Sequence, residues 1–141
     1  MTIREMARQA KDASVTLAAL SSDSKNKALQ AVAAALRKCG DDIIAANAID
    51  LEAAVAAGLP GPILKRLKFD AAKLNDVIAG VESLLALSDP AGVTLAATEL
   101  DQGLNLCKVS CPIGVIGVIF ESRPDALVQI STLCLKSGNA A

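Results

Sequence analysis

The stretch "PIGVIGVIFESRP", residues 112–124, decides the fold of this chain. It joins an apolar run, residues 115–120, to a polar corner that ends at Pro124. Apolar residues at successive positions are typical of a strand that is buried on both faces, as in a parallel sheet. A helix is expected over "PDALVQISTLCLKSG", because proline suits the first helical turn and Gly138 suits the stop. The stretch therefore predicts strand, corner and helix, which is the opening of a βαβ unit.

A parallel strand needs a partner strand after a crossover helix, and only "NAA" follows Gly138. We therefore expect the chain of 141 residues to be a fragment that ends inside its first repeat. An unpaired, flat, apolar strand is a template for aggregation, so residues 115–120 are expected to be poorly protected. The inner face of the helix after the corner is predicted from its apolar spacing to consist of Leu127, Ile130, Leu133 and Cys134.

Residues 1–91 are predicted to form an N-terminal helical segment. Thr2 and Glu5 fit a capping box, residues 21–24 can cap the next helix, and Asp70 can cap the most regular one. The apolar stripes predicted to face a core are Ile3, Met6, Ala7, Ala10, Ala13 and Leu17, then Ala28, Leu29, Val32, Ala33 and Leu36, then Leu74, Val77, Ile78, Val81, Leu84 and Leu85.

Two weaker signals lie between these helices. Gly40 is expected to end the second helix in a left-handed conformation. A shorter helix is expected over residues 49–58, closed by Gly58 and Pro60, with one or two further turns at 63–67. After Gly92 the period changes, and residues 92–111 are predicted to form a hairpin around the loop 101–103.

The composition excludes several classes of function. The chain is 52% hydrophobic and 21% charged, with a formal net charge of -1, so it is globular and gives no reason to expect nucleic acid or an anionic membrane as a partner. It contains no His, which removes His-dependent catalysis and His-ligated metals from within the chain. No apolar run reaches the roughly 20 residues that span a bilayer, and the charged N-terminus does not resemble a secretion signal. The cytoplasm is therefore the expected compartment.

The four cysteines, Cys39, Cys107, Cys111 and Cys134, form no CxxC pair. If Cys107 and Cys111 share one strand, they lie about 13 Å apart at roughly 3.3 Å per residue. That separation is too large for one disulfide or one metal ion. We expect no metal site and reduced cysteines that pack as small hydrophobic side chains. A nucleophilic cysteine stays open in principle, although no base lies near any of them in the sequence.

The corner is a candidate ligand site. Ligands of open α/β sheets bind at the carboxyl ends of the strands, and a helix N-terminus offers free N–H groups to a phosphate. Arg123 adds a charged fork of donors that suits a phosphate or an oxyanion. The alternative is structural: Arg123 can cap the helix or pair with Glu121 or Asp125, and Gly117 can serve only close packing.

The longer stretch "CPIGVIGVIFESRPDALVQISTLCLKSGNA", residues 111–140, closely resembles the gamma-glutamyl phosphate reductase family, also called glutamate-5-semialdehyde dehydrogenase, a branch of the aldehyde dehydrogenase superfamily. "AANAIDLEAAVAAGLP" and "LKRLKFDAAKLNDVIAGVESLLALSDP" resemble the N-terminal helices of the same family, so the resemblance covers essentially the whole chain. Other aldehyde dehydrogenases carry a proline-tryptophan-asparagine sequence at this corner. One departure is Ala141, where a branched apolar residue commonly begins the next strand.

The resemblance implies an α/β, aldehyde-dehydrogenase-like fold, truncated after the first strand and helix of a Rossmann-type parallel sheet. It divides the chain into a helical segment (1–91), a hairpin that serves as oligomerisation arm (92–111) and the start of the cofactor-binding domain (112–141). It also implies a reaction, in which NADPH reduces L-glutamate 5-phosphate to L-glutamate 5-semialdehyde and phosphate in proline biosynthesis. In that family a cysteine thiolate displaces phosphate, and hydride then reduces the thioester. The full-length protein would be a homo-oligomer.

The resemblance implies roles in this chain for the corner alone. Ile119, Phe120, Glu121 and Ser122 match the positions that line the pyrophosphate and nicotinamide side of the cofactor, largely with backbone. Arg123 matches the oxyanion-hole asparagine of other aldehyde dehydrogenases, and an arginine there suits a substrate that bears a phosphate. The catalytic cysteine is expected beyond residue 141, so no catalytic residue is assigned and the isolated chain is expected to be inactive.

Other interpretations stay open from the sequence. One is a different aldehyde dehydrogenase, which the "FESRP" corner disfavours. Another is a stand-alone helical interaction module, which would not need the apolar run 115–120. A decayed, inactive remnant of the reductase is the third.

Overall fold

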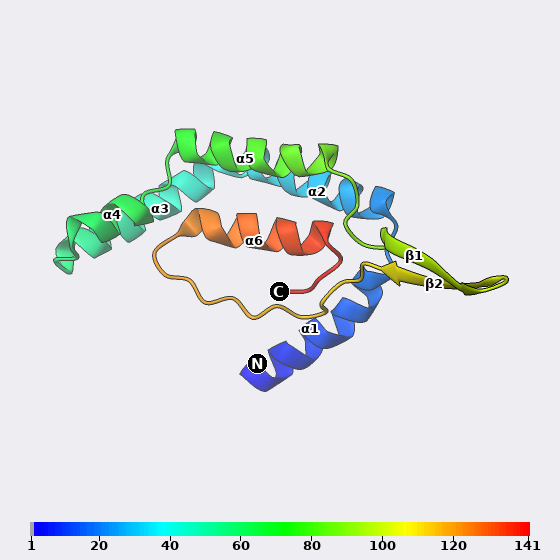
Figure 1. Cartoon of the computed structure of the whole chain (residues 1–141). Coiled ribbons are helices and arrows are strands. Elements are labelled where there is room, and N and C mark those ends of the chain that lie inside the picture. Colours follow the sequence, from blue (N-terminus) through cyan, green and yellow to red (C-terminus); the bar gives the residue numbers. More distant parts are fainter. Residues whose placement is uncertain (1) are drawn as a thin grey trace.

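The computed structural model describes residues 2–141, which form six helices and one two-stranded antiparallel sheet (Figure 1). In chain order the elements are α1 (Ile3–Ala18), α2 (Ser22–Lys38), α3 (Gly40–Ala56), α4 (Gly61–Leu67), α5 (Ala71–Ala86), β1 (Thr94–Asp101), β2 (Leu104–Val109) and α6 (Pro124–Lys136). Helices α2, α5 and α6 pack together as the body, while α3 and α4 extend from one end and the hairpin projects from the other. Among the described residues, no helix is both long and apolar enough to cross a membrane.

The predicted helix starts are confirmed by their hydrogen bonds. Thr2 and Glu5 form the capping box: Glu5 N–H donates to Thr2 Oγ1 at 3.3 Å, and Thr2 N–H donates to Glu5 Oε2 at 2.7 Å. Ser21 Oγ accepts from the backbone N–H of Ser24, and Asp70 Oδ1 accepts from that of Lys73. Each cap satisfies a backbone donor that the helix itself leaves free, and is worth about 1 kcal/mol.

The prediction for Gly40 is wrong, and with it the short helix over 49–58. Gly40 begins α3 and is not one of the glycines with positive φ. A Cβ at Gly40 would lie 2.7 Å from Leu74 Cδ2, so the glycine allows α3 to approach α5 closely. The buried residues of α3 are Gly40, Asn47 and Ala54, spaced seven apart. This stripe is narrow and built from small residues, so the spacing of large apolar side chains could not predict the buried face of α3.

The core lies between α2 and α5, and the predicted stripes of these two helices are confirmed. Leu29 and Val81 are its most enclosed side chains, with 0% and 2% of their surface exposed. Phe69 packs at its end, where Asn47 Nδ2 donates to the carbonyl of Leu67 and Asn47 Oδ1 accepts from Phe69 N–H. The full cluster of buried residues is Leu29, Ala33, Phe69, Leu74, Val77, Ile78, Val81 and Leu84.

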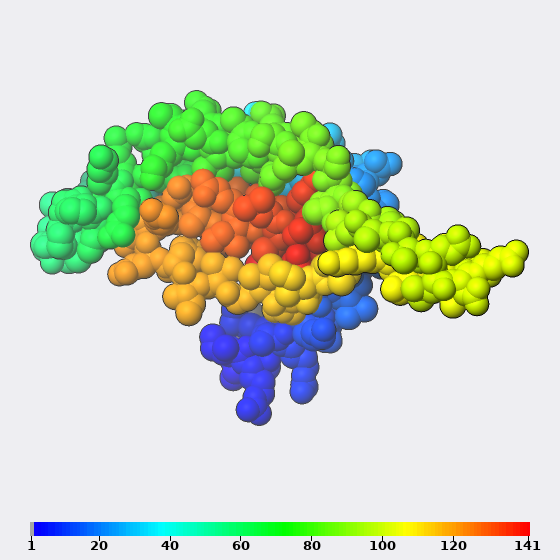
Figure 2. All heavy atoms as spheres, viewed as in Figure 1, coloured from blue at the N-terminus to red at the C-terminus, as the bar shows by residue number. Residues whose placement is uncertain are grey.

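The predicted stripe of α1 is largely exposed in this structure, and that of α6 is confirmed only in part, because Cys134 is buried and Ile130 is half-buried. Ser14 is the buried residue of α1, whereas Ile3 and Met6 are 81% and 48% exposed. On α6 the predicted Leu127 and Leu133 are more than half exposed, and Val128 and Leu135 pack against the core instead. Figure 2 shows α1 projecting from the body.

The predicted buried strand over 115–120 is wrong for this structure. Residues 112–123, here called the strap, run in extended form along α6 (Figure 1), and only Val115 makes a bridge, parallel to Ala140. Alternate residues contact the body, so Ile116 and Val118 are half-buried while Ile119 is fully exposed. A strand requires a hydrogen-bonded neighbour along its length, and within residues 2–141 the strap has one only at its start. The structure is consistent with the α/β class, and residues 2–141 do not show the Rossmann-type parallel sheet.

The strap is therefore expected to be the least protected ordered backbone outside the termini. Within the described chain, the backbone of residues 117–122 makes no hydrogen bond, whereas Leu29 and Val81 lie in packed helices. Amide exchange reports such local opening. Hydrogen exchange of the chain should show fast exchange at 117–122 and slow exchange at Leu29 and Val81. Protection of 117–122 comparable to that of Val81 in a monomer would contradict this.

The predicted hairpin is formed. Strands β1 and β2 pair antiparallel, with Asp101 opposite Leu104 and Gly103 at φ +76° in the connection. Every residue of both strands is exposed. The base is fixed by Ser110, whose Oγ accepts from Val93 N–H at 2.9 Å and donates to the carbonyl of Pro90 at 2.7 Å. Figure 2 shows the hairpin standing clear of the body. The division of the chain into domains remains a prediction.

Candidate functional site

The corner, residues 119–124, lies where α5 and α6 both begin. Lys73 in the first turn of α5 and Asp125 in the first turn of α6 are joined across this end, with Nζ 4.0 Å from Oδ1. Each helix presents the positive end of its dipole there. Two N-termini and the side chains of Lys73 and Arg123 therefore make this end of the body attractive to an anion.

Ser122 gives the backbone of the corner a left-handed conformation. Its φ is +51°, the one positive value at a non-glycine residue among those described. This left-handed conformation is uncommon outside glycine and costs energy, so a local constraint must hold it. Arg123 follows as the N-cap of α6, without a capping side chain, and Pro124 begins the helix. The corner thus offers unpaired backbone donors and acceptors beside a helix N-terminus.

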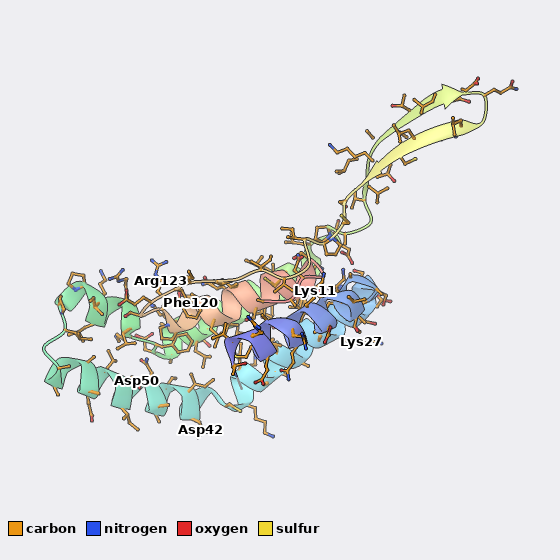
Figure 3. The ribbon with its side chains drawn as sticks, turned by 90° about the horizontal axis from the view of Figure 1, so that it is seen from below. Lys11, Lys27, Asp42, Asp50, Phe120 and Arg123 are labelled. Carbon is orange, nitrogen blue, oxygen red and sulfur yellow. The ribbon has the colours of Figure 1, made fainter. Side chains whose placement is uncertain are left out.

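The structural alternatives for Arg123 are not realised within the described chain. Its guanidinium does not cap α6, and it makes no ion pair with Glu121 or Asp125. The side chain is exposed. Figure 3 shows Arg123 and Phe120 close together at one end of α6. An exposed guanidinium with free donors can bind a phosphate in bidentate geometry without first breaking an internal hydrogen bond.

The predicted cofactor positions lie together on the outer end of the strap. Ile119 is 102% exposed and Phe120 47% exposed, and Glu121 is exposed beside the half-buried Ser122. Phe120 also lines an open groove of about 440 Å³, between α1, the strap and α6. The structure therefore brings Ile119, Phe120, Glu121 and Ser122 next to Arg123, as one accessible surface.

The charges around the corner are partly compensated. Lys68 Nζ lies 2.9 Å from Asp70 Oδ2, and this side-chain hydrogen bond, helped by the backbone N–H of Lys73, lowers the pKa of Asp70. Asp125 Oδ1 is buried without a hydrogen-bond partner in the described residues, and Lys73 is its neighbour. Arg123 is left as the uncompensated cation of the corner.

The pairing of Asp125 with Lys73 was not predicted, because from the sequence Asp125 is a possible partner of its neighbour Arg123. The role of Asn139, which bonds the start of the strap, was also not predicted. No local pattern reveals either contact, since both join residues distant in the chain.

The four cysteines are free thiols. Cys39, Cys107 and Cys111 are exposed and Cys134 is buried, and none of the four is in a disulfide. Burial raises the pKa of the Cys134 thiol, which disfavours the nucleophilic thiolate. No cluster of three metal-binding side chains occurs among residues 2–141.

Known proteins resemble the chain in sequence and in fold. It is 60% identical over 139 residues to the gamma-glutamyl phosphate reductase of Pelotomaculum thermopropionicum and equally similar to that of Acetivibrio thermocellus, each match covering 99% of this chain and 32% of the relative. The crystal structures of the reductases from Saccharomyces cerevisiae and Thermotoga maritima superpose with TM-scores of 0.96 and 0.92, at 38% and 34% identity. These matches cover 100% and 96% of this chain and 36% and 33% of the respective structures.

No family model matches the chain. The chain spans about a third of the length of the curated relatives that it matches. The resemblance predicted from the sequence is confirmed: over nearly its whole length, this chain is similar to the N-terminal third of gamma-glutamyl phosphate reductases.

Proposed function

We propose that this chain forms the N-terminal part of an NADPH-dependent reductase that converts L-glutamate 5-phosphate to L-glutamate 5-semialdehyde and phosphate in proline biosynthesis. The similarity to named reductases supports the reaction. The observation that supports a role for this part is the exposed guanidinium of Arg123, which no internal partner occupies, at the end where α5 and α6 begin.

In this proposal Arg123 binds the substrate. A guanidinium and a helix N-terminus together favour the dianionic acyl phosphate, and the same donors stabilise negative charge that develops as the carbonyl is attacked. The attacking cysteine belongs to a part of the reductase outside residues 1–141. This chain then contributes binding, orientation and charge stabilisation, and no nucleophile.

Residues 119–122 fit a cofactor that is held largely by backbone. Their N–H and C=O groups are unpaired within the described chain. Ile119, Phe120, Glu121 and Ser122 would line the pyrophosphate and nicotinamide side, and the exposed Phe120 and Ile119 offer apolar surface to a ring. When bound, NADPH supplies the hydride.

The exposed apolar hairpin supports assembly of the full-length protein into a homo-oligomer through this arm, as the resemblance implies. A biosynthetic reaction that consumes NADPH supports the cytoplasm as compartment. The comparisons give no support to a stand-alone helical module or an inactive remnant.

The chain alone is expected to show no reductase activity, because in this proposal the nucleophilic cysteine belongs to a part of the reductase outside residues 1–141. The measurement is NADPH oxidation with L-glutamate 5-phosphate by residues 1–141. Turnover by the purified chain would contradict the proposal.

The positive test uses a hybrid reductase, in which residues 1–141 replace the matched N-terminal third of the Acetivibrio thermocellus relative. Release of phosphate and aldehyde in step with NADPH oxidation is the expected result. A folded hybrid that forms neither product would overturn the proposed function.

A further inference from the structure

Asn139 joins the start of the strap, at Gly114, to the C-terminal end of α6, at Ser137. It is 5% exposed, and its side chain uses both of its polar atoms. Oδ1 accepts from Gly114 N–H at 2.8 Å, and Nδ2 donates to Ser137 Oγ at 2.8 Å. Ser137 belongs to the C-terminal cap of α6, so the carboxamide joins the strap to the end of that helix.

Backbone contacts complete this junction. Ala140 N–H donates to the carbonyl of Gly114, and Ile116 N–H donates to the carbonyl of Ala140, each at 2.8 Å. Gly114 has φ +116° and Gly138 has φ +74°, conformations that suit glycine. A Cβ on Gly138 would lie 3.0 Å from Pro112 Cγ, so the strap and the turn after α6 are in close contact.

The strap has no other hydrogen-bonded anchor before the corner. Within residues 2–141, Asn139 is the one side chain that bonds the backbone of residues 112–122. The next fixed point is the start of α6 at Pro124. Ile116 is the last residue of the strap with a backbone hydrogen bond before the corner. The eight residue steps from Ile116 to Pro124 cover about 26 Å in extended form, whereas the 13 residues of α6 cover about 20 Å. A slip of one residue at Gly114 would shift the strap by about 3.3 Å and exchange its two faces.

We propose that Asn139 is a positioning residue for the corner: by binding Gly114 it fixes the register of the strap on α6, and hence the placement of residues 119–123. This inference rests on the proposed function, in which those residues bind substrate and cofactor. Asn139 itself touches neither, and it acts through the backbone of the strap.

The first measurement is hydrogen exchange of residues 1–141 carrying Asn139→Ala. Loss of the Gly114 hydrogen bond should speed exchange at Gly114 and Ile116 about tenfold, the equivalent of one hydrogen bond. Leu29 and Val81 should exchange as before, because Asn139 is not part of the core cluster between α2 and α5. Ser137→Ala is the matched control, since it removes the closer partner of Nδ2, Ser137 Oγ at 2.8 Å, and leaves the 3.4 Å contact of Nδ2 to the Ser137 carbonyl and the bond of Oδ1 to Gly114.

The second measurement is steady-state kinetics of the hybrid reductase. Asn139→Ala should lower kcat roughly 10–100-fold through misplacement of the corner, while KM for L-glutamate 5-phosphate changes less than about threefold because Arg123 remains accessible. Ser137→Ala should leave both parameters near those of the unsubstituted hybrid. The rate of the unsubstituted hybrid tests the proposed function alone, and the ratio of variant to unsubstituted hybrid tests Asn139.

Faster exchange at Gly114 together with a selective loss of kcat supports the proposal. Unchanged exchange at Gly114 overturns it. Faster exchange with unchanged kcat also overturns it, because Asn139 would then hold the strap without influence on the chemistry. An equal loss in Ser137→Ala would overturn it as well, since the Gly114 bond would not be the cause.

Discussion

Arg123→Ala is expected to lower kcat of the hybrid reductase by on the order of 10²–10³, the cost of removing one charged donor from a developing oxyanion. The side chain is exposed and unpaired within the described chain, so its removal should leave the thermal stability nearly unchanged. Arg123→Lys keeps the charge but loses the planar fork of donors. It should be nearly as damaging if the phosphate is bound in bidentate fashion.

The matched control is Arg37→Ala on α2. Arg37 is also an exposed arginine, and its guanidinium pairs with Glu82 on the surface. Its loss should change kcat less than about threefold. If Arg123→Ala and Arg123→Lys also retain kcat within about threefold at unchanged stability, Arg123 has no role toward the substrate, and the corner is only the beginning of a helix.

Asp89→Asn is expected to cost about 3 kcal/mol of stability, because it leaves a buried ammonium without its counter-charge. The Lys25 side chain is 3% exposed, and its Nζ lies 2.6 Å from Asp89 Oδ2 and 2.7 Å from Oδ1. Asp89 also accepts from Ala91 N–H at 3.0 Å, so it ties the linker between α5 and the hairpin to α2. Thermal or denaturant unfolding of residues 1–141 measures the effect.

Glu82→Gln is the control for this prediction. It breaks the Arg37–Glu82 pair, in which both side chains are about half exposed, and should cost less than about 1 kcal/mol. Equal losses of stability from Asp89→Asn and Glu82→Gln would contradict this prediction, because burial of Lys25 would then not raise the cost of breaking its ion pair.

The same pair gives a pH dependence with a definite sign. Burial acts to raise the pKa of Asp89, but the hydrogen bonds from Lys25 and Ala91 and the charges of Lys25 and Lys136 lower it below its ordinary value. A lowered folded pKa means that the pair stabilises the fold above about pH 4 and that this stabilisation is lost as the pH falls through the folded value. The stability of Asp89→Asn should therefore fall less steeply below pH 4 than that of the unsubstituted chain.

The helix starts and the core stripes were predictable because they depend on neighbours in sequence. Thr2, Ser21 and Asp70 cap their own first turns. Leu29 on α2 and Val81 on α5 each belong to an apolar stripe that repeats with the period of a helix. The corner was predictable for the same reason, since Arg123 and Pro124 adjoin the apolar run.

Gly40 and the strap were mispredicted because tertiary contacts decide them. The absence of a side chain at Gly40 leaves room for Leu74, which lies on α5. The apolar pattern of 115–120 indicates a strand with neighbours on both sides, whereas residues 2–141 supply one parallel bridge, at Val115. Asn139 was missed because its partner Gly114 is set by the return of the chain along α6.

The kcat/KM of the hybrid reductase for L-glutamate 5-phosphate, relative to that of the intact Acetivibrio thermocellus relative, tests most directly whether residues 1–141 serve this reaction. At 60% identity over the replaced part, the hybrid is expected to reach within about tenfold of the intact enzyme, because the corner, the strap and the core it rests on are supplied by this chain. A hybrid that unfolds as cooperatively as the intact enzyme but oxidises no NADPH with this substrate would contradict it.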